Sequence, residues 1–235
     1  MKIENSVAFV TGANRGLGLA FAKALLAGGA RKVYAAARDP DSVTLPGVIP
    51  VRLDVTNTDE IEAAARAGGD VDLLINNAGI ARGVGLLGPD SVRAARAELE
   101  TNYFGPLEVS RAFAPILARN GGGAIINVLS ALSWVSFPSS STYSVSKAAA
   151  WSLTNGLRNE LRPQSTQVLA LHVGYMDTDM AAHIDAPKSR PEDVVKFTLQ
   201  TLEAGGEEAL ADEVSRSVKK GLSAERGVYL SIPGR

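Results

Sequence analysis

Short apolar runs alternate with longer amphipathic segments along almost the whole chain. The runs have strand length and are apolar on both faces, as expected of a parallel sheet that helices cover on both sides. We expect strands at 6–12, 32–38, 47–55, 71–79, 123–130, 166–174 and 207–212. Helices are expected at 16–29, 58–68, 90–120, 142–162, 190–206 and 213–222, with either a break or a bend near Gly105-Pro106 in the third. The alternation predicts an α/β fold, a doubly wound parallel sheet of about seven strands with helices on both faces.

Composition limits what such a fold can do here. The 235 residues show no linker, repeat or low-complexity tract, so we expect one domain over 1–235. A formal net charge of −1 gives no electrostatic reason to expect a nucleic acid or membrane partner. The absence of cysteine excludes disulfides and thiolate chemistry, and two isolated histidines predict no metal site. The apolar runs are too short for a signal peptide or a membrane span, so we expect a cytoplasmic protein.

The stretch "VTGANRGLGLA" joins the first expected strand to the first expected helix. Its glycines, Gly12, Gly16 and Gly18, suit a sharp turn that a pyrophosphate must approach closely, at a helix N-terminus with free N–H groups. The alternative is a glycine-rich turn without a ligand. The position of the stretch favours a dinucleotide site, with contacts from Gly12, Asn14, Arg15, Gly16, Leu17 and Gly18.

The end of the second expected strand, "AAARDP", bears on which dinucleotide would bind. An NAD site usually carries a carboxylate there, but Ala37 is neutral and Arg38 is basic. Arg38 together with Arg15 would suit a 2′-phosphate, which favours NADP. If Asp39 holds the ribose instead, the cofactor is NAD, and Arg38 is then a solvated surface charge.

The stretch "STYSVSK" places Tyr143 and Lys147 one helical turn apart, so that the two side chains share a helix face. A phenol beside an ammonium group can serve as an acid–base catalyst. The spacing alone is weak evidence, because such pairs also arise by chance.

Several short motifs, taken in order, carry a resemblance to a known family. They are "TGANRGLG" at 11–18, "LDVT" at 53–56, "NNAG" at 76–79, an asparagine at 102, a serine at 130 and "YSVSK" at 143–147. The chain resembles the short-chain dehydrogenases/reductases in their compact single-domain form, from about residue 5 to residue 212. The resemblance implies a Rossmann-type sheet and an NADP(H)-dependent oxidoreductase that transfers hydride between the nicotinamide and a carbonyl or alcohol substrate.

The resemblance also implies a role for each matching residue. Tyr143 would be the general acid in reduction and the general base in oxidation, and Lys147 would lower the phenol pKa and hold the nicotinamide ribose. Ser130 would bind the substrate oxygen, and Asn102 would anchor a water that relays protons to Lys147. Further cofactor contacts would come from Asp54, Val55, Asn76, Ala78, Gly79, Gly174 and Thr178.

The sequence departs from the family pattern after the sixth expected strand. Val173 stands where the family usually has a proline before Gly174, which loosens a rigid turn. His172 precedes this turn, and we expect it to be a hydrogen-bonded structural residue rather than a catalyst. His183 is expected at the surface.

Substrate contacts are expected from loops at the carboxyl ends of the strands. Besides Ser130 and Tyr143, the candidates are Leu132, Trp134, Phe137, Tyr175 and Met180, and residues 81–87 are a further possible wall. These side chains are largely apolar, which indicates an apolar carbonyl or alcohol substrate. Trp134 and Phe137 could instead pack locally or at a subunit contact. The short segment 178–190 predicts an open site.

The resemblance implies a homodimer or homotetramer in which the helices at 102–120 and 142–162 pair between subunits. Phe113, Trp151 and Leu157 are the apolar side chains expected to exceed what one core face needs. Two other functions stay open. One is a non-catalytic NADP(H)-binding sensor or scaffold, and the other is a relative that has lost its cofactor.

Overall fold

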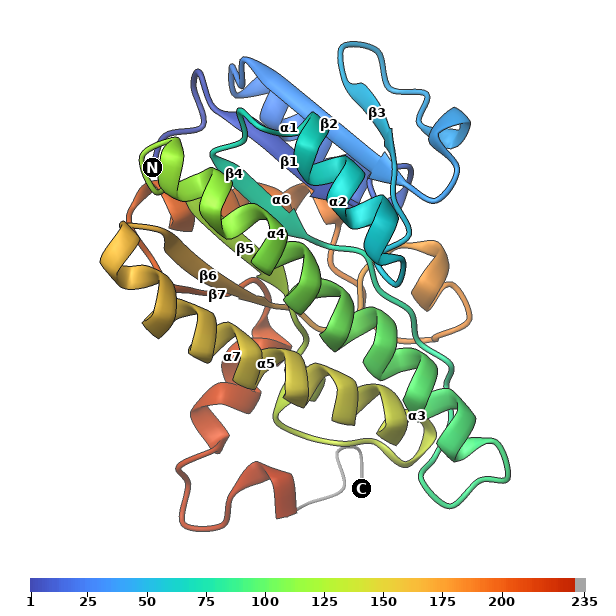
Figure 1. Cartoon of the computed structure of the whole chain (residues 1–235). Helices are drawn as coiled ribbons and strands as arrows, with labels where there is room; N and C mark the ends of the chain where they lie inside the picture. The colour runs from blue at the N-terminus through green and yellow to red at the C-terminus, as the bar shows by residue number, and fades with distance from the viewer. Residues whose placement is uncertain (231–235) are drawn as a thin grey trace.

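Seven parallel strands form one sheet in the computed structural model, which describes residues 1–230 (Figure 1). The strands are β1 (Val7–Thr11), β2 (Lys32–Ala37), β3 (Ile49–Arg52), β4 (Leu73–Asn76), β5 (Ala124–Val128), β6 (Gln167–His172) and β7 (Glu208–Leu210). Their order is β3-β2-β1-β4-β5-β6-β7, and every pair is parallel. The predicted doubly wound α/β sheet is confirmed. The last five residues of the expected domain, 231–235, lie outside the described part.

Helices cover both faces of this sheet (Figure 1). The helices are α1 (Gly16–Ala27), α2 (Thr58–Ala67), α3 (Ser91–Leu99), α4 (Gly105–Arg119), α5 (Ser141–Leu161), α6 (Pro191–Glu203) and α7 (Glu213–Gly221). One core lies between the sheet and α1 and α6, and the other lies between the sheet and α2, α4 and α5. Within residues 1–230, no helix is both long enough and apolar enough to cross a bilayer.

Side chains of β1 show why a strand in this position is apolar throughout. Ala8 and Val10 enter the core under α1 and α6, whereas Val7 and Phe9 enter the core on the opposite face. Successive side chains of a strand point to opposite faces, so both sets must be apolar when helices cover both.

The helical region at 90–120 is continuous and contains one irregular turn. A π-helical turn at Glu100–Phe104 joins α3 to α4, and Gly105 and Pro106 are the first residues of α4. The irregularity therefore precedes Gly105-Pro106 instead of falling on this pair. A Cβ on Gly105 would lie 2.8 Å from Val55 Cγ2, so glycine lets α4 approach the loop after β3. Such π turns are common at functional sites.

Two of the side chains expected at a subunit contact belong to the core of the single chain. Phe113 is fully buried and packs on Phe9, with ring centroids 4.8 Å apart, and Leu157 is only 7% exposed. The expectation was wrong for both, because α4 and α5 cover the sheet and each other and bury a wider stripe than one core face. Trp151 is half-buried. The homodimer or homotetramer stays a prediction.

Replacing Phe113 should test how far the fold depends on this packing. Phe113→Ala removes a ring from a fully buried position, and we expect the free energy of unfolding to fall by about 3–5 kcal/mol. Leu87→Ala, at a fully exposed leucine, should change it by less than about 0.5 kcal/mol. Urea denaturation followed by circular dichroism measures both values. Equal effects of the two changes would contradict this assignment of the core.

Candidate active site

The strand order reverses between β1 and β4, and the segments after these two strands meet at the carboxyl edge of the sheet. Asn77 Nδ2 donates to the carbonyl oxygens of Thr11 (2.8 Å) and Gly12 (3.1 Å). Thr11 Oγ1 in turn accepts hydrogen bonds from the backbone N–H groups of Asn77 and Ala78. Thr11 and Asn77 were not among the predicted site residues. The sequence motifs could have indicated both residues, because each adjoins a predicted residue in its own motif.

The glycine turn has the backbone geometry of a phosphate-binding loop. Gly12 and Gly16 have φ values of +64° and +55°, in the left-handed region that favours glycine. A Cβ on Gly18 would lie 2.2 Å from the Gly12 carbonyl oxygen, so only glycine permits this close packing of turn and helix. Within the described chain, no side chain caps the N-terminus of α1 and its first turn has no acidic residue. Its N–H groups can therefore receive a pyrophosphate.

The three charged residues considered for the ribose site have different surroundings. Asp39 begins a short 3₁₀ turn at Pro40–Ser42, and its Oδ1 accepts from the Asp41 backbone N–H at 3.2 Å. Arg38 is exposed and forms no ion pair with any residue in 1–230. Arg15 pairs with Asp179 at 2.7 Å, so its guanidinium is directed to the segment after β6. The ion pair gives Arg15 a carboxylate partner within the protein, and its convergence with Arg38 on a ribose phosphate stays a prediction.

The turn after β6 is held without the family's proline. Val173 is 2% exposed and belongs to the core, and the Gly174 N–H donates to Asp212 Oδ2 at 2.6 Å. Asp212 also caps α7, so this buried carboxylate ties the turn to a helix. Sequence reasoning missed Asp212, which lies far along the chain. Thr178 Cγ2 lies 3.5 Å from where a Cβ of Gly16 would be, which places Thr178 opposite the glycine turn.

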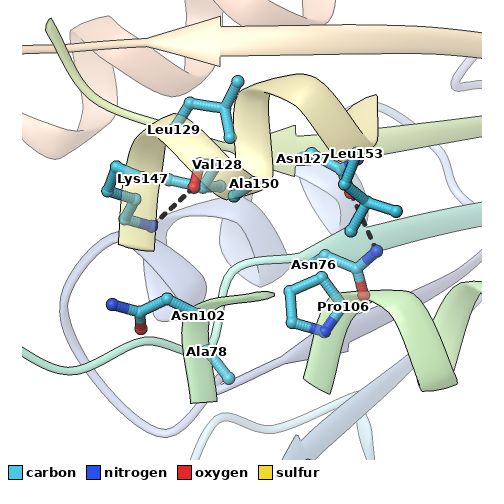
Figure 2. A pocket seen from close by; sticks show the side chains of 10 residues that line it. All are labelled: Asn76, Ala78, Asn102, Pro106, Asn127, Val128, Leu129, Lys147, Ala150 and Leu153. Carbon is cyan, nitrogen blue, oxygen red and sulfur yellow. Dashed lines mark hydrogen bonds between the residues drawn. The ribbon is translucent and has the colours of Figure 1, made fainter. Parts of the chain in front are cut away.

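The expected adenine and groove residues occupy different environments. Val55 is buried, and Asp54 Oδ1 accepts from the backbone N–H and the hydroxyl of Thr56. Asn76 Nδ2 donates to Asn127 Oδ1 (Figure 2) and to Ser110 Oγ, within the helix-covered face of the sheet. Asn76 thus supports the strand end from inside, and Asn77 is the asparagine that holds the glycine turn.

The start of α5 and the end of β5 bring the expected catalytic side chains to one edge of the sheet. Lys147 Nζ donates to the Val128 carbonyl oxygen at 2.8 Å (Figure 2) and lies 5.7 Å from the centre of the Tyr143 ring. Ser130 follows Val128 by two residues, and its Oγ accepts from the Leu132 N–H at 3.1 Å. The serine hydrogen is therefore free to donate to another oxygen.

Asn102 lies in the π-helical turn with 1% of its surface exposed. Its Nδ2 donates to the Ile80 carbonyl oxygen and to Ser146 Oγ, and its Oδ1 accepts from the Ile80 N–H, each at 2.9 Å. Both amide hydrogens are used, so only Oδ1 has a lone pair left for a water. Asn102 and Lys147 line a cavity of about 10 Å³ (Figure 2), which has room for roughly one water. A Cβ on Gly79 would lie 3.1 Å from Asn102 Oδ1.

Burial governs the charges of the tyrosine and the lysine. It raises the pKa of the Tyr143 phenol well above its ordinary value, and the nearby Glu98 carboxylate raises this pKa further. Burial lowers the pKa of the Lys147 ammonium group to about 8. The protein alone therefore favours a protonated phenol beside a lysine that titrates close to neutral pH.

The buried ring of His172 contacts the backbone of Ser130. The ring is fully buried, its Nδ1 lies 3.0 Å from the Ser130 carbonyl oxygen, and burial lowers the pKa of the imidazole to about 4. A neutral ring with a proton on Nδ1 fits this contact, as expected of a structural histidine. Its Nε2 has no hydrogen-bond partner in the described part of the chain, so only one of the two ring nitrogens is satisfied.

Trp134 is packed on several sides. Its ring stacks on His172 with centroids 3.8 Å apart, meets Trp151 edge-on, and has Lys219 Nζ 5.0 Å from its centre. These contacts account for Trp134 without a substrate, in line with the local-packing alternative. Leu132 and Phe137 are half-buried, and Tyr175 and Met180 are 36% and 48% exposed. Their substrate contacts stay predictions. No cluster of three or more acidic or histidine side chains in residues 1–230 could hold a metal ion.

Comparison with known proteins agrees with this geometry. The family model described as short chain dehydrogenase matches residues 6–189. The chain belongs to the short chain dehydrogenase family. Short chain dehydrogenases share this nicotinamide-binding fold, and the glycine turn of this chain fits such a cofactor by its φ angles and its uncapped helix.

Two solved structures show how similar the fold is. A short chain dehydrogenase from Burkholderia cenocepacia J2315, in complex with NADP, is 45% identical and has a TM-score of 0.92, with 96% of each chain covered. A short chain dehydrogenase/reductase from Burkholderia phymatum, in complex with NAD, is 26% identical with a TM-score of 0.84, over 94% of each chain. Both cofactors therefore occur among relatives of this fold.

Two curated relatives are longer than this chain. The short chain dehydrogenase tazN of Aspergillus terreus is 31% identical over 224 residues, which are 88% of this chain and 48% of the relative. Oxidoreductase BOA17 of Botryotinia fuckeliana is 35% identical over 184 residues, which are 74% of this chain and 66% of the relative. The chain thus spans about half to two thirds of these relatives, and their similarity establishes the family without establishing the substrate.

Replacing Gly18 should test the glycine turn. A Cβ there would meet the Gly12 carbonyl oxygen, so Gly18→Ala should force the turn open and weaken the binding of a nicotinamide dinucleotide by at least about ten-fold. Gly156→Ala is the matched control, since a Cβ at this position within α5 meets nothing within 4 Å. The control should keep full affinity and gain up to about 1 kcal/mol of stability. Fluorescence titration measures binding, and unchanged affinity in a folded Gly18→Ala protein would contradict the assignment.

Proposed function

We propose that the protein is an NADP(H)-dependent oxidoreductase that interconverts an apolar carbonyl compound and its alcohol. The observation that carries the proposal is the position of Lys147 Nζ, which lies 5.7 Å from the centre of the Tyr143 ring and donates to Val128, two residues before Ser130. A sensor or scaffold that only binds the dinucleotide would not need a buried lysine beside a half-buried phenol.

The choice of NADP is supported by the surroundings of Arg38 and Asp39. Asp39 is engaged in its own turn, whereas Arg38 is exposed and without an ion pair in residues 1–230, so a 2′-phosphate could bind its guanidinium. Arg15 uses Nη1 for Asp179 and keeps other N–H groups for the same phosphate. The similar Burkholderia cenocepacia protein binds NADP, which is in line with this choice.

The bound nicotinamide would supply or accept the hydride. Tyr143 donates its phenolic proton to the substrate oxygen in reduction and, as phenolate, takes it back in oxidation. Ser130 donates its free hydroxyl hydrogen to the same oxygen and so orients it. The Lys147 ammonium group donates one N–H to the Val128 carbonyl oxygen and has two N–H groups left. One can donate to the nicotinamide ribose and the other to a water in the cavity beside Asn102. Its positive charge lowers the free energy of the phenolate.

Arg38 provides the test of the cofactor. Arg38→Ala should weaken NADPH binding by about ten- to hundred-fold, because one to three kcal/mol of charge-assisted hydrogen bonding is lost, and should leave NADH binding unchanged. Arg31→Ala is the matched control, since Arg31 is an exposed arginine at the opposite end of β2. Fluorescence titration with both dinucleotides measures the effect. A preference of the unmodified protein for NADH would mean that Asp39 holds the ribose.

Tyr143 provides the test of the reaction. Tyr143→Phe removes the transferable proton, so kcat/KM for reduction of apolar ketones and aldehydes should fall at least about 100-fold. NADPH affinity should change by less than about two-fold, because the aromatic ring remains. Tyr229→Phe, at an exposed tyrosine, is the control and should keep full activity. Undiminished turnover by Tyr143→Phe would show that another group supplies the proton.

A further inference from the structure

Glu98 is a completely buried carboxylate in α3, one helical turn before Asn102. Its Oε1 accepts a hydrogen bond from the Arg82 backbone N–H at 2.6 Å. Its Oε2 is also buried and has no hydrogen-bond partner in the described residues. Burying a carboxylate without an ion pair is unfavourable, and a neutral amide could accept the same hydrogen bond. An acid at this position differs from an amide in that, when ionised, it can also act on its neighbours through its charge.

Three side chains hold alternate residues of the segment 80–84. Asn102 binds the N–H and the carbonyl oxygen of Ile80, and Glu98 binds the N–H of Arg82. The third is Thr142, whose N–H and hydroxyl both donate to the Val84 carbonyl oxygen. Thr142 directly precedes Tyr143, so the segment connects the helix that carries Glu98 with the helix that carries the catalytic phenol.

The charge of Glu98 acts on that phenol. After burial itself, the Glu98 carboxylate is the group that raises the pKa of Tyr143. Lys147, on the same helix as Tyr143, has its Nζ 5.7 Å from the centre of the tyrosine ring, and the Arg82 side chain is exposed to solvent. A carboxylate in a water-poor environment opposes the formation of a second negative charge nearby.

We propose that Glu98 is a positioning residue with two tasks: it fixes the segment 80–84 against the helix that carries Tyr143, and its negative charge adds to burial in favouring the protonated Tyr143 phenol. The protonated phenol is the form that carbonyl reduction uses, in which its proton goes to the substrate oxygen while hydride goes to the carbon. This inference rests on the proposed oxidoreductase function, and it gives the site a bias toward the proton-donating state.

The test removes the charge while keeping the hydrogen bond. In Glu98→Gln, the pH at which alcohol oxidation with NADP reaches half of its maximal kcat/KM should fall by about one pH unit. Glu98→Leu, a second neutral variant, should shift the same way and also raise the KM for the substrate, because the Arg82 N–H loses its acceptor. Glu100→Gln makes the same charge change at an exposed residue of the following turn and should shift nothing.

A second measurement separates this inference from the proposed function. The ultraviolet absorbance of tyrosinate, with the Tyr143→Phe protein subtracted, follows the ionisation of Tyr143 without any turnover. It should appear at lower pH in both neutral variants than in the unmodified protein. An identical titration in all three proteins would overturn the role of Glu98. A clear shift in a protein that turns over no carbonyl or alcohol would retain that role and refute the proposed function.

Discussion

The hydrogen bonds between Asn77 and the chain at Thr11 and Gly12 hold together the two halves on which the site depends. The glycine turn after β1 belongs to the dinucleotide half, and the chain after β4 leads to the wall of the catalytic half. The parallel sheet brings both strand ends to one edge, but it does not fix the loops beyond them. The half-buried side-chain amide of Asn77 does so, because it donates to two backbone carbonyl oxygens of the glycine turn. The close approach of turn and helix at Gly18 depends on the same contact, since Asn77 Nδ2 also lies against that glycine.

At the candidate catalytic edge of the sheet, burial opposes charge. Desolvation favours the neutral forms of both Tyr143 and Lys147. The protein surroundings alone therefore place neither side chain in its most reactive form. A cationic ring bound beside them would favour phenolate, and a carboxylate behind them favours phenol. The state of the proton therefore depends on a balance between groups on different elements. This balance gives a physical reason for an acid in a wall that apolar side chains could have filled.

Much of this arrangement could be predicted from the sequence, and the failures have identifiable causes. Strand and helix positions followed from local periodicity, and the pairing of Tyr143 with Lys147 followed from helical spacing. Asn77, which holds the glycine turn, was missed although the neighbouring Asn76 was predicted, because successive residues at a strand end point to opposite sides and a motif does not say which side each one faces. The partner of Arg15 is 164 residues away, beyond the reach of any local pattern. Glu98 reads as a solvated helix charge until tertiary packing shows that it is buried.

The segment 80–84, which side chains of α3, the π-helical turn and α5 hold, shows why polar side chains are buried there. Ala81, Arg82 and Gly83 are exposed, and Gly83 has a φ of +66°, so this stretch has neither an apolar anchor nor a regular ladder of its own. The stretch is therefore held through hydrogen bonds to its backbone groups. Asn102 and Glu98, four residues apart across the junction of α3 and the π-helical turn, bind three backbone groups: the N–H and the carbonyl oxygen of Ile80 and the N–H of Arg82. A π-helical turn changes the direction in which its side chains point compared with a regular helix. The irregular turn, through Asn102, and the buried acid Glu98 therefore act together in holding this loop beside the candidate catalytic residues.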